Sequence, residues 1–196
     1  GRVMVNGFSM SRISDRQIPY MRRTIGVIFQ DFRLIEKKTV YENLSFAMRA
    51  VGSSPREAKK RIPYVLKLVG LDGKANQFPN QLSGGEQQRI ALARAILKDA
   101  PIVVLDEATA FADPENEGKI LAAFSHLIKG KTVLVIAHRL STITNADRIL
   151  YVDKGVIAEQ GTHEQLLALK GEYARMWETY NRAKRWTIGG KNNRKL

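Results

Sequence analysis

Two adjacent carboxylates follow a strongly apolar segment of the sequence and are suited to metal-assisted chemistry on a phosphate. Asp106 and Glu107 come directly after Ile102 to Leu105, a run typical of a buried strand. Neighbouring side chains of a strand point in different directions, so the two carboxylates can have different tasks. One can hold a hard Mg²⁺ ion while the next polarises an attacking water, which favours Asp106 for the metal and Glu107 for the base. The alternative is a helix cap or a solvated turn.

A pair of glycines at the start of a predicted helix forms a second candidate site. The segment 82–87 reads Leu-Ser-Gly-Gly-Glu-Gln and opens a helical pattern that continues to Lys98. Each glycine costs ~1 kcal/mol relative to alanine in a helix, so another role must favour Gly84 and Gly85. Bare N–H groups at the positive end of the helix dipole give a phosphate access to the backbone. The alternative is an ordinary capping box, in which Ser83 pairs with Glu86.

Two further polar residues stand where predicted strands end. Gln30 follows the β-rich run 24–29, and His138 follows the apolar run 132–137. An amide oxygen can bind Mg²⁺ and sense a γ-phosphate, and a neutral imidazole can donate to that phosphate or hold a water. Taken alone, Gln30 could be a plain loop residue and His138 a structural histidine.

Strands and helices alternate along the chain, which predicts an α/β fold with a mainly parallel sheet. Residues 40–71 have a helical pattern with a cap at Ser54, and residues 148–159 read as a hairpin followed by a helix capped at Thr162. Ligands of α/β folds bind at the carboxyl ends of the strands. The residues predicted at such ends are Gln30, Asp106, Glu107 and His138.

The composition is that of a globular domain. The 196 residues include 44% hydrophobic and 26% charged side chains and no cysteine. The apolar fraction excludes a disordered chain, and the longest apolar runs are far shorter than the ~18 residues of a membrane span, so we expect a soluble domain. Without cysteine there is no disulfide framework and no thiolate metal site.

The formal net charge of +13 is partly concentrated at the end of the chain. Residues 181–196 hold six basic side chains and no acidic one. This balance is compatible with binding to nucleic acid or to an anionic membrane. A basic tail that contains Gly189 and Gly190 is, however, more typical of a solvated terminus.

Taken in order along the chain, these features resemble the nucleotide-binding domain of ABC ATPases. The segment 82–87 is similar to the family's signature, residues 102–107 to its Walker B strand, Gln30 to its Q-loop and His138 to its switch histidine. The resemblance implies a P-loop NTPase-like α/β fold that uses ATP and Mg²⁺. It implies catalytic roles for Glu107, His138 and Gln30, and a metal held by Asp106 and Gln30.

By the same resemblance, two such domains face each other head to tail, and the signature of one closes on ATP held by the other. Asp113 lies at the position of the family's D-loop, where Ala-Phe-Ala-Asp replaces the usual Ser-Ala-Leu-Asp. The residues that would bind the partner's nucleotide are Ser83, Gly84, Gly85, Gln87 and Asp113.

The resemblance implies a motor for a membrane complex, in which MgATP closes a homo- or heterodimer of ABC ATPase domains and the motion reaches a transmembrane partner. A single domain would span residues 1–180, with a helical subdomain at about 40–98, and a basic tail would follow at 181–196. The expected location is cytoplasmic, peripheral on the inner face of the cell membrane. No specific nucleic acid is expected as a partner.

The sequence departs from the family at its phosphate-cradling loop, because it contains no Gly-x-x-x-x-Gly-Lys-Ser/Thr. The nearest candidate, Gly130-Lys131-Thr132, has Ser125 where the first glycine belongs and leads into a predicted strand rather than a helix. We expect the family's N-terminal strand, P-loop and helix to lie in ~40 residues upstream of Gly1. We also expect the isolated chain to be inactive.

Different parts of the chain resemble two branches of the family. Residues 1 to about 95 resemble FtsE cell-division ATP-binding proteins, and residues from about 99 to 180 resemble the ATPase domain of ABC exporters. A crossover within residues 82–98, which both branches share, is the plainest account. Two alternatives to the motor domain are a truncated or chimeric non-hydrolytic half-site and, supported only by the basic charge, a DNA-associated ABC-type ATPase head.

Overall fold

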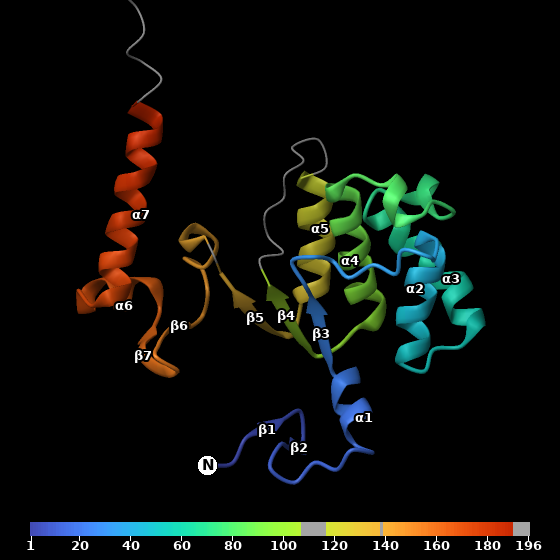
Figure 1. Ribbon diagram of the computed structural model, residues 1–196, viewed down its shortest axis with the longest axis horizontal. Helices are drawn as coiled ribbons and strands as arrows, with labels where there is room; N and C mark the ends of the chain where they lie inside the picture. The colour runs from blue at the N-terminus through green and yellow to red at the C-terminus, as the bar shows by residue number, and fades with distance from the viewer. Residues whose placement is uncertain (107–116, 138, 190–196) are drawn as a thin grey trace, which may run out of the picture. The chain divides into compact units, whose positions relative to one another are not determined.

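The computed structural model describes residues 1–106, 117–137 and 139–189, apart from the side chains of 117–122 and 183–189. The predicted site residues Glu107, Asp113 and His138 lie outside the described residues. The chain divides into two compact units, Gly1–Ile136 and Ala137–Leu196 (Figure 1). None of the helices in the described ranges combines the length and the apolar character that a membrane span needs.

The first unit opens with a short antiparallel hairpin. Strand β1 (Met4–Val5) pairs with β2 (Phe8–Ser9) across a two-residue turn. The turn residues Asn6 and Gly7 have φ angles of 45° and 85°, the left-handed pair that suits a two-residue hairpin turn. Helix α1 (Ile18–Arg23) then leads directly into the sheet.

Three parallel strands form the centre of this unit. Strands β3 (Ile25–Ile28), β4 (Ile102–Asp106) and β5 (Thr132–Ile136) lie in the order β3-β4-β5. Ile28 pairs with Leu105, which in turn pairs with Val135. The predicted α/β fold with a parallel sheet is therefore confirmed, and the strands end close to the same level.

Four helices of the first unit pack around the sheet and one another. They are α2 (Val40–Ala50), α3 (Pro55–Leu68), α4 (Gly84–Lys98) and α5 (Glu117–Ile128), with the short turns η1 (Asp72–Lys74) and η2 (Pro79–Gln81) before α4. The capping box predicted at Ser54 is present, with the Ser54 side chain bound to the N–H of Glu57. Thr39 caps α2 in the same way.

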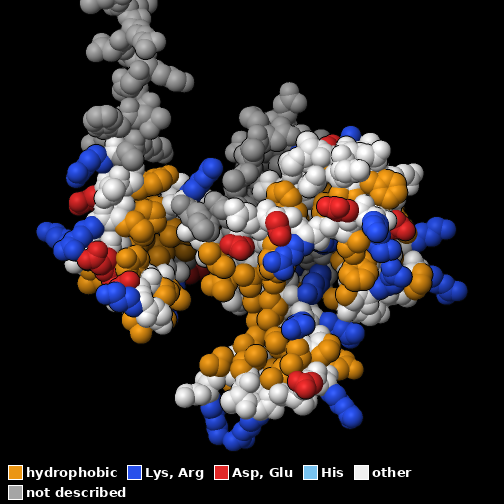
Figure 2. Space-filling model, in the orientation of Figure 1, with side chains coloured by type: hydrophobic (Ala, Val, Ile, Leu, Met, Phe, Trp, Pro, Cys, Tyr) orange, Lys and Arg blue, Asp and Glu red, His pale blue; other side chains and the backbone are white. Residues whose placement is uncertain are grey.

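The two faces of the sheet differ in burial. Ile28, Val103 and Leu105 are fully buried in the core with side chains of α4 such as Ile90 and Leu97. The side chains of the other face alternate with these, and Leu134 and Ile136 of β5 remain 52% and 47% exposed. Figure 2 shows hydrophobic side chains gathered over this open face. Because Asp106 follows Leu105, its side chain belongs to the open face.

The second unit has its own small core. Strands β6 (Ile149–Asp153) and β7 (Val156–Gly161) form the predicted hairpin, and α6 (His163–Leu169) begins at the predicted cap, Thr162. Ile149, Leu166 and Tyr173 pack together beside the turn η3 (Leu140–Thr142). Helix α7 (Glu172–Gly189) extends through nine residues of the stretch predicted as a basic tail. The single domain over residues 1–180 stays a prediction.

A buried amide organises the loop between β3 and α2. Asn43 is 1% exposed, and its Oδ1 accepts the Ile35 N–H at 2.8 Å. Its Nδ2 donates to the carbonyls of Ile35, Lys38 and Thr39 at 3.0–3.1 Å. One side chain thus satisfies several backbone groups of the segment that follows Gln30.

We predict that Asn43→Ala lowers the free energy of unfolding by about 2–4 kcal/mol, because the part-buried Ile35 N–H and the Lys38 carbonyl lose their partner, while the carbonyls of Ile35 and Thr39 each keep a backbone N–H. Urea denaturation of the 196-residue chain measures this loss. Arg49→Ala, an exposed change on the same helix, is the matched control and should cost less than about 0.5 kcal/mol. Equal stabilities of the two variants would contradict the role given to Asn43.

Candidate functional site

Two of the predicted site residues reach the same edge of the sheet. Asp106 is the last residue of β4, and Gln30 follows the end of β3 by two residues. Because β3 and β4 are adjacent and parallel, their carboxyl ends meet at one edge. Gln30 is exposed and Asp106 is half-buried. The arrangement brings an amide and a carboxylate to one edge of the sheet, and the binding of a hard cation by both stays a prediction.

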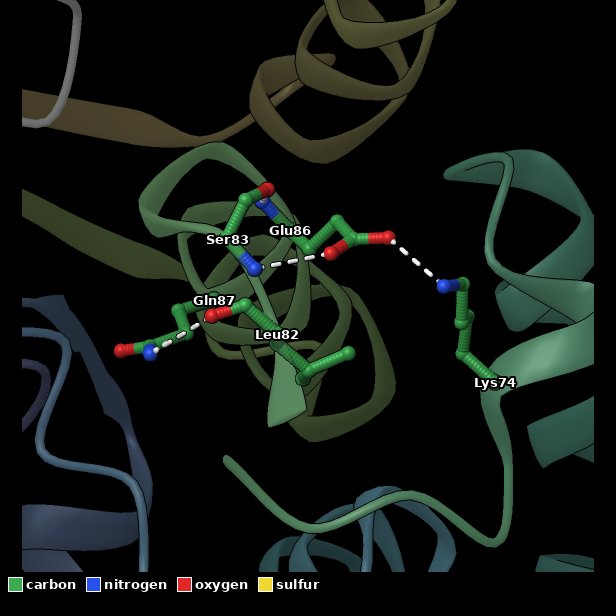
Figure 3. A network of polar contacts seen from close by, with 5 residues as sticks. All are labelled: Lys74, Leu82, Ser83, Glu86 and Gln87. Atoms are coloured by element: carbon green, nitrogen blue, oxygen red, sulfur yellow. Dashed lines mark hydrogen bonds and ion pairs between the residues drawn. The ribbon is translucent and has the colours of Figure 1, made fainter. Parts of the chain in front are cut away.

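The other predicted cluster lies at the start of α4 (Figure 3). Ser83 is the N-cap, with extended backbone angles of φ −65° and ψ 160°. Its N–H donates to the Glu86 carboxylate at 2.8 Å, and its Oγ accepts the Glu86 N–H at 3.3 Å. The capping box weighed from the sequence is therefore present, and a phosphate contact by Ser83 stays a prediction.

The first turn of α4 is open above Gly84. A Cβ placed on Gly84 would meet no atom within 4 Å, so the surrounding atoms do not require glycine there. Gly84 is also exposed, and Gly85 is half-buried. The N–H groups of a helix's first turn have no intrahelical partner. The backbone here can therefore be approached closely by an external acceptor.

Gln87 points back toward the segment before the helix. Its Nε2 donates to the carbonyl of Pro79 at 3.0 Å. It also donates to the carbonyl of Leu82 at 3.3 Å (Figure 3). The amide nitrogen therefore fixes the approach to the cap, and direct contact of Gln87 with a nucleotide stays a prediction.

Glu86 links the cap to a neighbouring turn. Its carboxylate lies 3.2 Å from the Lys74 ammonium of η1 (Figure 3). The hydrogen bond from the Ser83 backbone, followed by the bond and charge of Lys74, holds the pKa of Glu86 below its ordinary range. The carboxylate therefore stays ionised at neutral pH.

The glycine-lysine-threonine sequence at 130–132 is confirmed as unrelated to a P-loop. Gly130 lies in a turn with φ 69°, and Thr132 begins β5 rather than a helix. Lys131 is paired with Asp99 at 2.8 Å. This lysine is therefore part of the loop structure between α5 and β5.

A groove of about 480 Å³ runs beside the edge strand β3. Its wall is mostly apolar and includes Val27, Phe29 and the half-exposed Phe46. Its basic members are Arg22, Arg33, Arg94 and Lys98. This groove was not predicted from the sequence, although Arg94 and Lys98 beside the apolar residues in the second half of α4 are a signal of it.

We predict that the contribution of Glu86 to stability depends on pH. Because its folded pKa is lowered, the contribution is present at neutral pH and is lost as the pH falls through the folded pKa. Glu86→Gln keeps an amide oxygen for the Ser83 N–H but loses the charge near Lys74. We expect a cost of about 0.5 kcal/mol at pH 7, because much of the charge is screened by solvent, and this cost shrinks as the pH falls toward and through the folded pKa.

Urea denaturation of both proteins at several pH values measures this difference. Glu57→Gln is the matched control, since Ser54 and Glu57 form the same capping box. A difference between the native chain and Glu86→Gln that is constant from pH 7 to pH 3 would contradict the role of the Glu86 charge.

Comparison with known proteins identifies the family. The pattern of the ABC transporter family matches residues 1–110. The chain is 39% identical over 175 residues to the cell division ATP-binding protein FtsE of Streptococcus pneumoniae, covering 88% of this chain and 73% of that protein. It is 42% identical over 183 residues to the ATP-dependent lipid A-core flippase of Syntrophus aciditrophicus, covering 90% of this chain and 30% of the flippase.

Solved structures agree with these matches. A bacterial Atm1-family ABC exporter with ATP bound superposes with a TM-score of 0.75 at 32% identity, over 91% of this chain and 32% of the exporter. The ATP-binding cassette MJ0796, solved as a dimer bound to ADP and Pi, gives 0.71 at 32% identity, over 83% of this chain and 73% of the cassette. The chain belongs to the ABC transporter family, with the fold of its ATP-binding domains.

Proposed function

We propose that the chain is the ATP-binding subunit or domain of an ABC-type membrane complex, in which MgATP-driven pairing of two such domains is coupled to a transmembrane partner. The observation that carries this proposal is the capped start of α4, where Ser83 precedes two glycines with open space above Gly84. The dimer of MJ0796 supports pairing, and the names of FtsE and of the flippase support work in cell division or transport.

The sheet edge supplies the groups that a metal-nucleotide site needs. Asp106 and Gln30 offer oxygen ligands of the kind that Mg²⁺ prefers, and both follow adjacent parallel strands. Bound Mg²⁺ would neutralise negative charge on the phosphates. In our proposal Glu107 polarises the attacking water and His138 donates to the γ-phosphate.

The cluster on α4 would serve the nucleotide of the partner domain. Ser83, Gly84 and Gly85 lie at the positive end of a helix of 15 residues, where an anion is stabilised by the dipole and by bare N–H groups. Gln87 and Asp113 complete this group in our proposal. The subunit would act at the inner face of the cell membrane.

The alternative, a half-site that lends its signature to a competent partner, has a specific observation in its favour. The 196-residue sequence contains no Gly-x-x-x-x-Gly-Lys-Ser/Thr loop. A DNA-associated ATPase head is disfavoured, because such heads are interrupted by a long coiled coil. Residues 31–81 instead fold into α2 of 11 residues, α3 of 14 residues and short turns.

We predict that the 196-residue chain alone does not hydrolyse ATP. Its sequence lacks the Gly-x-x-x-x-Gly-Lys-Ser/Thr loop, whose lysine and backbone N–H groups would bind the β- and γ-phosphates. Phosphate release should equal that of its Glu107→Gln variant under the same conditions. Measurable turnover that Glu107→Gln abolishes would contradict this prediction.

We predict that mixing this chain with a competent partner domain restores one active site. The partner is a full-length ABC ATPase domain that has an intact phosphate loop but an inactivated signature serine, so turnover needs Ser83 of this chain. Steady-state phosphate release should rise on mixing, and Ser83→Arg in this chain should reduce the gain by about tenfold or more. No gain on mixing, or the same gain with Ser83→Arg, would count against the proposed function.

A further inference from the structure

Two basic side chains of α4 bind backbone carbonyls at opposite ends of β3. Lys98 donates to the carbonyl of Arg22 at 3.0 Å and to that of Ile25, where β3 begins. Arg94, one turn earlier on the helix, donates from Nη1 to the carbonyl of Arg33 at 2.7 Å and from Nη2 to that of Phe32. Burial lowers the pKa of the Arg94 guanidinium and of the Lys98 ammonium.

The carbonyls that Arg94 binds belong to an uncommon backbone turn. Phe32 and Arg33 have φ angles of 55° and 44°, in the left-handed region that costs a residue with a side chain roughly 1–2 kcal/mol. Two consecutive residues of this kind persist only where other contacts hold them. The guanidinium of Arg94 provides such a contact because its planar fork can bind two acceptors at once.

This turn directly follows Gln30. On one side of Gln30, Ile28 is held by its pairing with Leu105. On the other side, the carbonyl of Phe32 is held by Arg94. Without Arg94, the side chains of Phe32 and Leu34 still pack against the core, but the next backbone hydrogen bond to another element is that of the Ile35 N–H to Asn43. The stretch between such backbone bonds would then roughly double in length, with Gln30 near its start.

We propose that Arg94 is a positioning residue for Gln30, because it fixes the turn at Phe32 and Arg33 to the helix that begins at Ser83. The importance of Gln30 rests on the proposed function, whereas the positioning itself does not. Arg94 lies 11 residues after Ser83, or ~16 Å along a helix at 1.5 Å per residue. A displacement of α4 at its phosphate-facing end would therefore move the Gln30 segment with it.

Hydrogen exchange followed by mass spectrometry on the 196-residue chain, without nucleotide, tests the proposal. Arg94→Met should speed exchange of the amides in residues 30–34 by about tenfold. Arg94→Lys, which keeps the charge but loses the fork, should give an intermediate rate. Lys98→Met is the matched control, because it removes a similar contact from the other end of β3 and should leave residues 30–34 unchanged.

The free energy of unfolding, measured in urea for each variant, separates positioning from general stabilisation. A merely structural role would speed exchange throughout the first unit in proportion to the stability lost. Unchanged exchange at residues 30–34 in Arg94→Met, or equal acceleration in Arg94→Met and Lys98→Met, would overturn the proposal. If circular dichroism shows that Arg94→Met does not fold, exchange at residues 30–34 is compared between Arg94→Lys and Lys98→Arg instead. Faster exchange in Arg94→Lys alone supports the proposal, and unchanged or equal exchange in the two variants overturns it. Since no nucleotide is present, this result stands apart from that of the mixing assay.

Discussion

The parallel pairing of β3, β4 and β5 is the constraint on which the candidate site depends. Because Ile28 pairs with Leu105 and Leu105 pairs with Val135, the strands deliver whatever follows them to one edge of the sheet. Gln30 and Asp106 reach that edge although they are far apart in the sequence. No direct contact between the two side chains is needed to bring them to this edge, since the backbone hydrogen bonds between the strands do so.

Helix α4 adds a second constraint, because one element performs several tasks. Its apolar side packs on the sheet through residues such as Ile90 and Leu97, and its start carries the capped glycines. Arg94 of the same helix binds the turn that follows β3, and Lys98 binds the end of α1 and the start of β3. The cap and the Gln30 segment are therefore attached to the same helix, and in our proposal a displacement of one is transmitted to the other through that helix.

The sequence was sufficient where a local pattern decides the structure. Apolar runs predicted β4 and β5, cap residues predicted the starts of α3, α4 and α6, and strand ends placed Gln30 and Asp106. It was insufficient where a long side chain meets backbone far along the chain, as Arg94 meets Phe32. Nothing in Phe32 or Arg33 signals a left-handed φ, which glycine or asparagine would have done. The extent of α7 was also hidden, because basic composition alone does not separate a helix from a tail.

The start of α4 shows how stability can leave room for a ligand. Each of the two glycines destabilises a helix by ~1 kcal/mol, and a good N-cap stabilises it by about as much as one glycine costs. Here the cap is reinforced by the Lys74 ion pair, and the rest of the helix is held by its buried face. Tertiary packing, rather than propensity, therefore maintains the first turn. The Ser83 side chain binds the Glu86 N–H, whereas the N–H groups of Gly84 and Gly85 lie in the first turn, where a helix provides no partner, and this is the arrangement that an approaching anion requires.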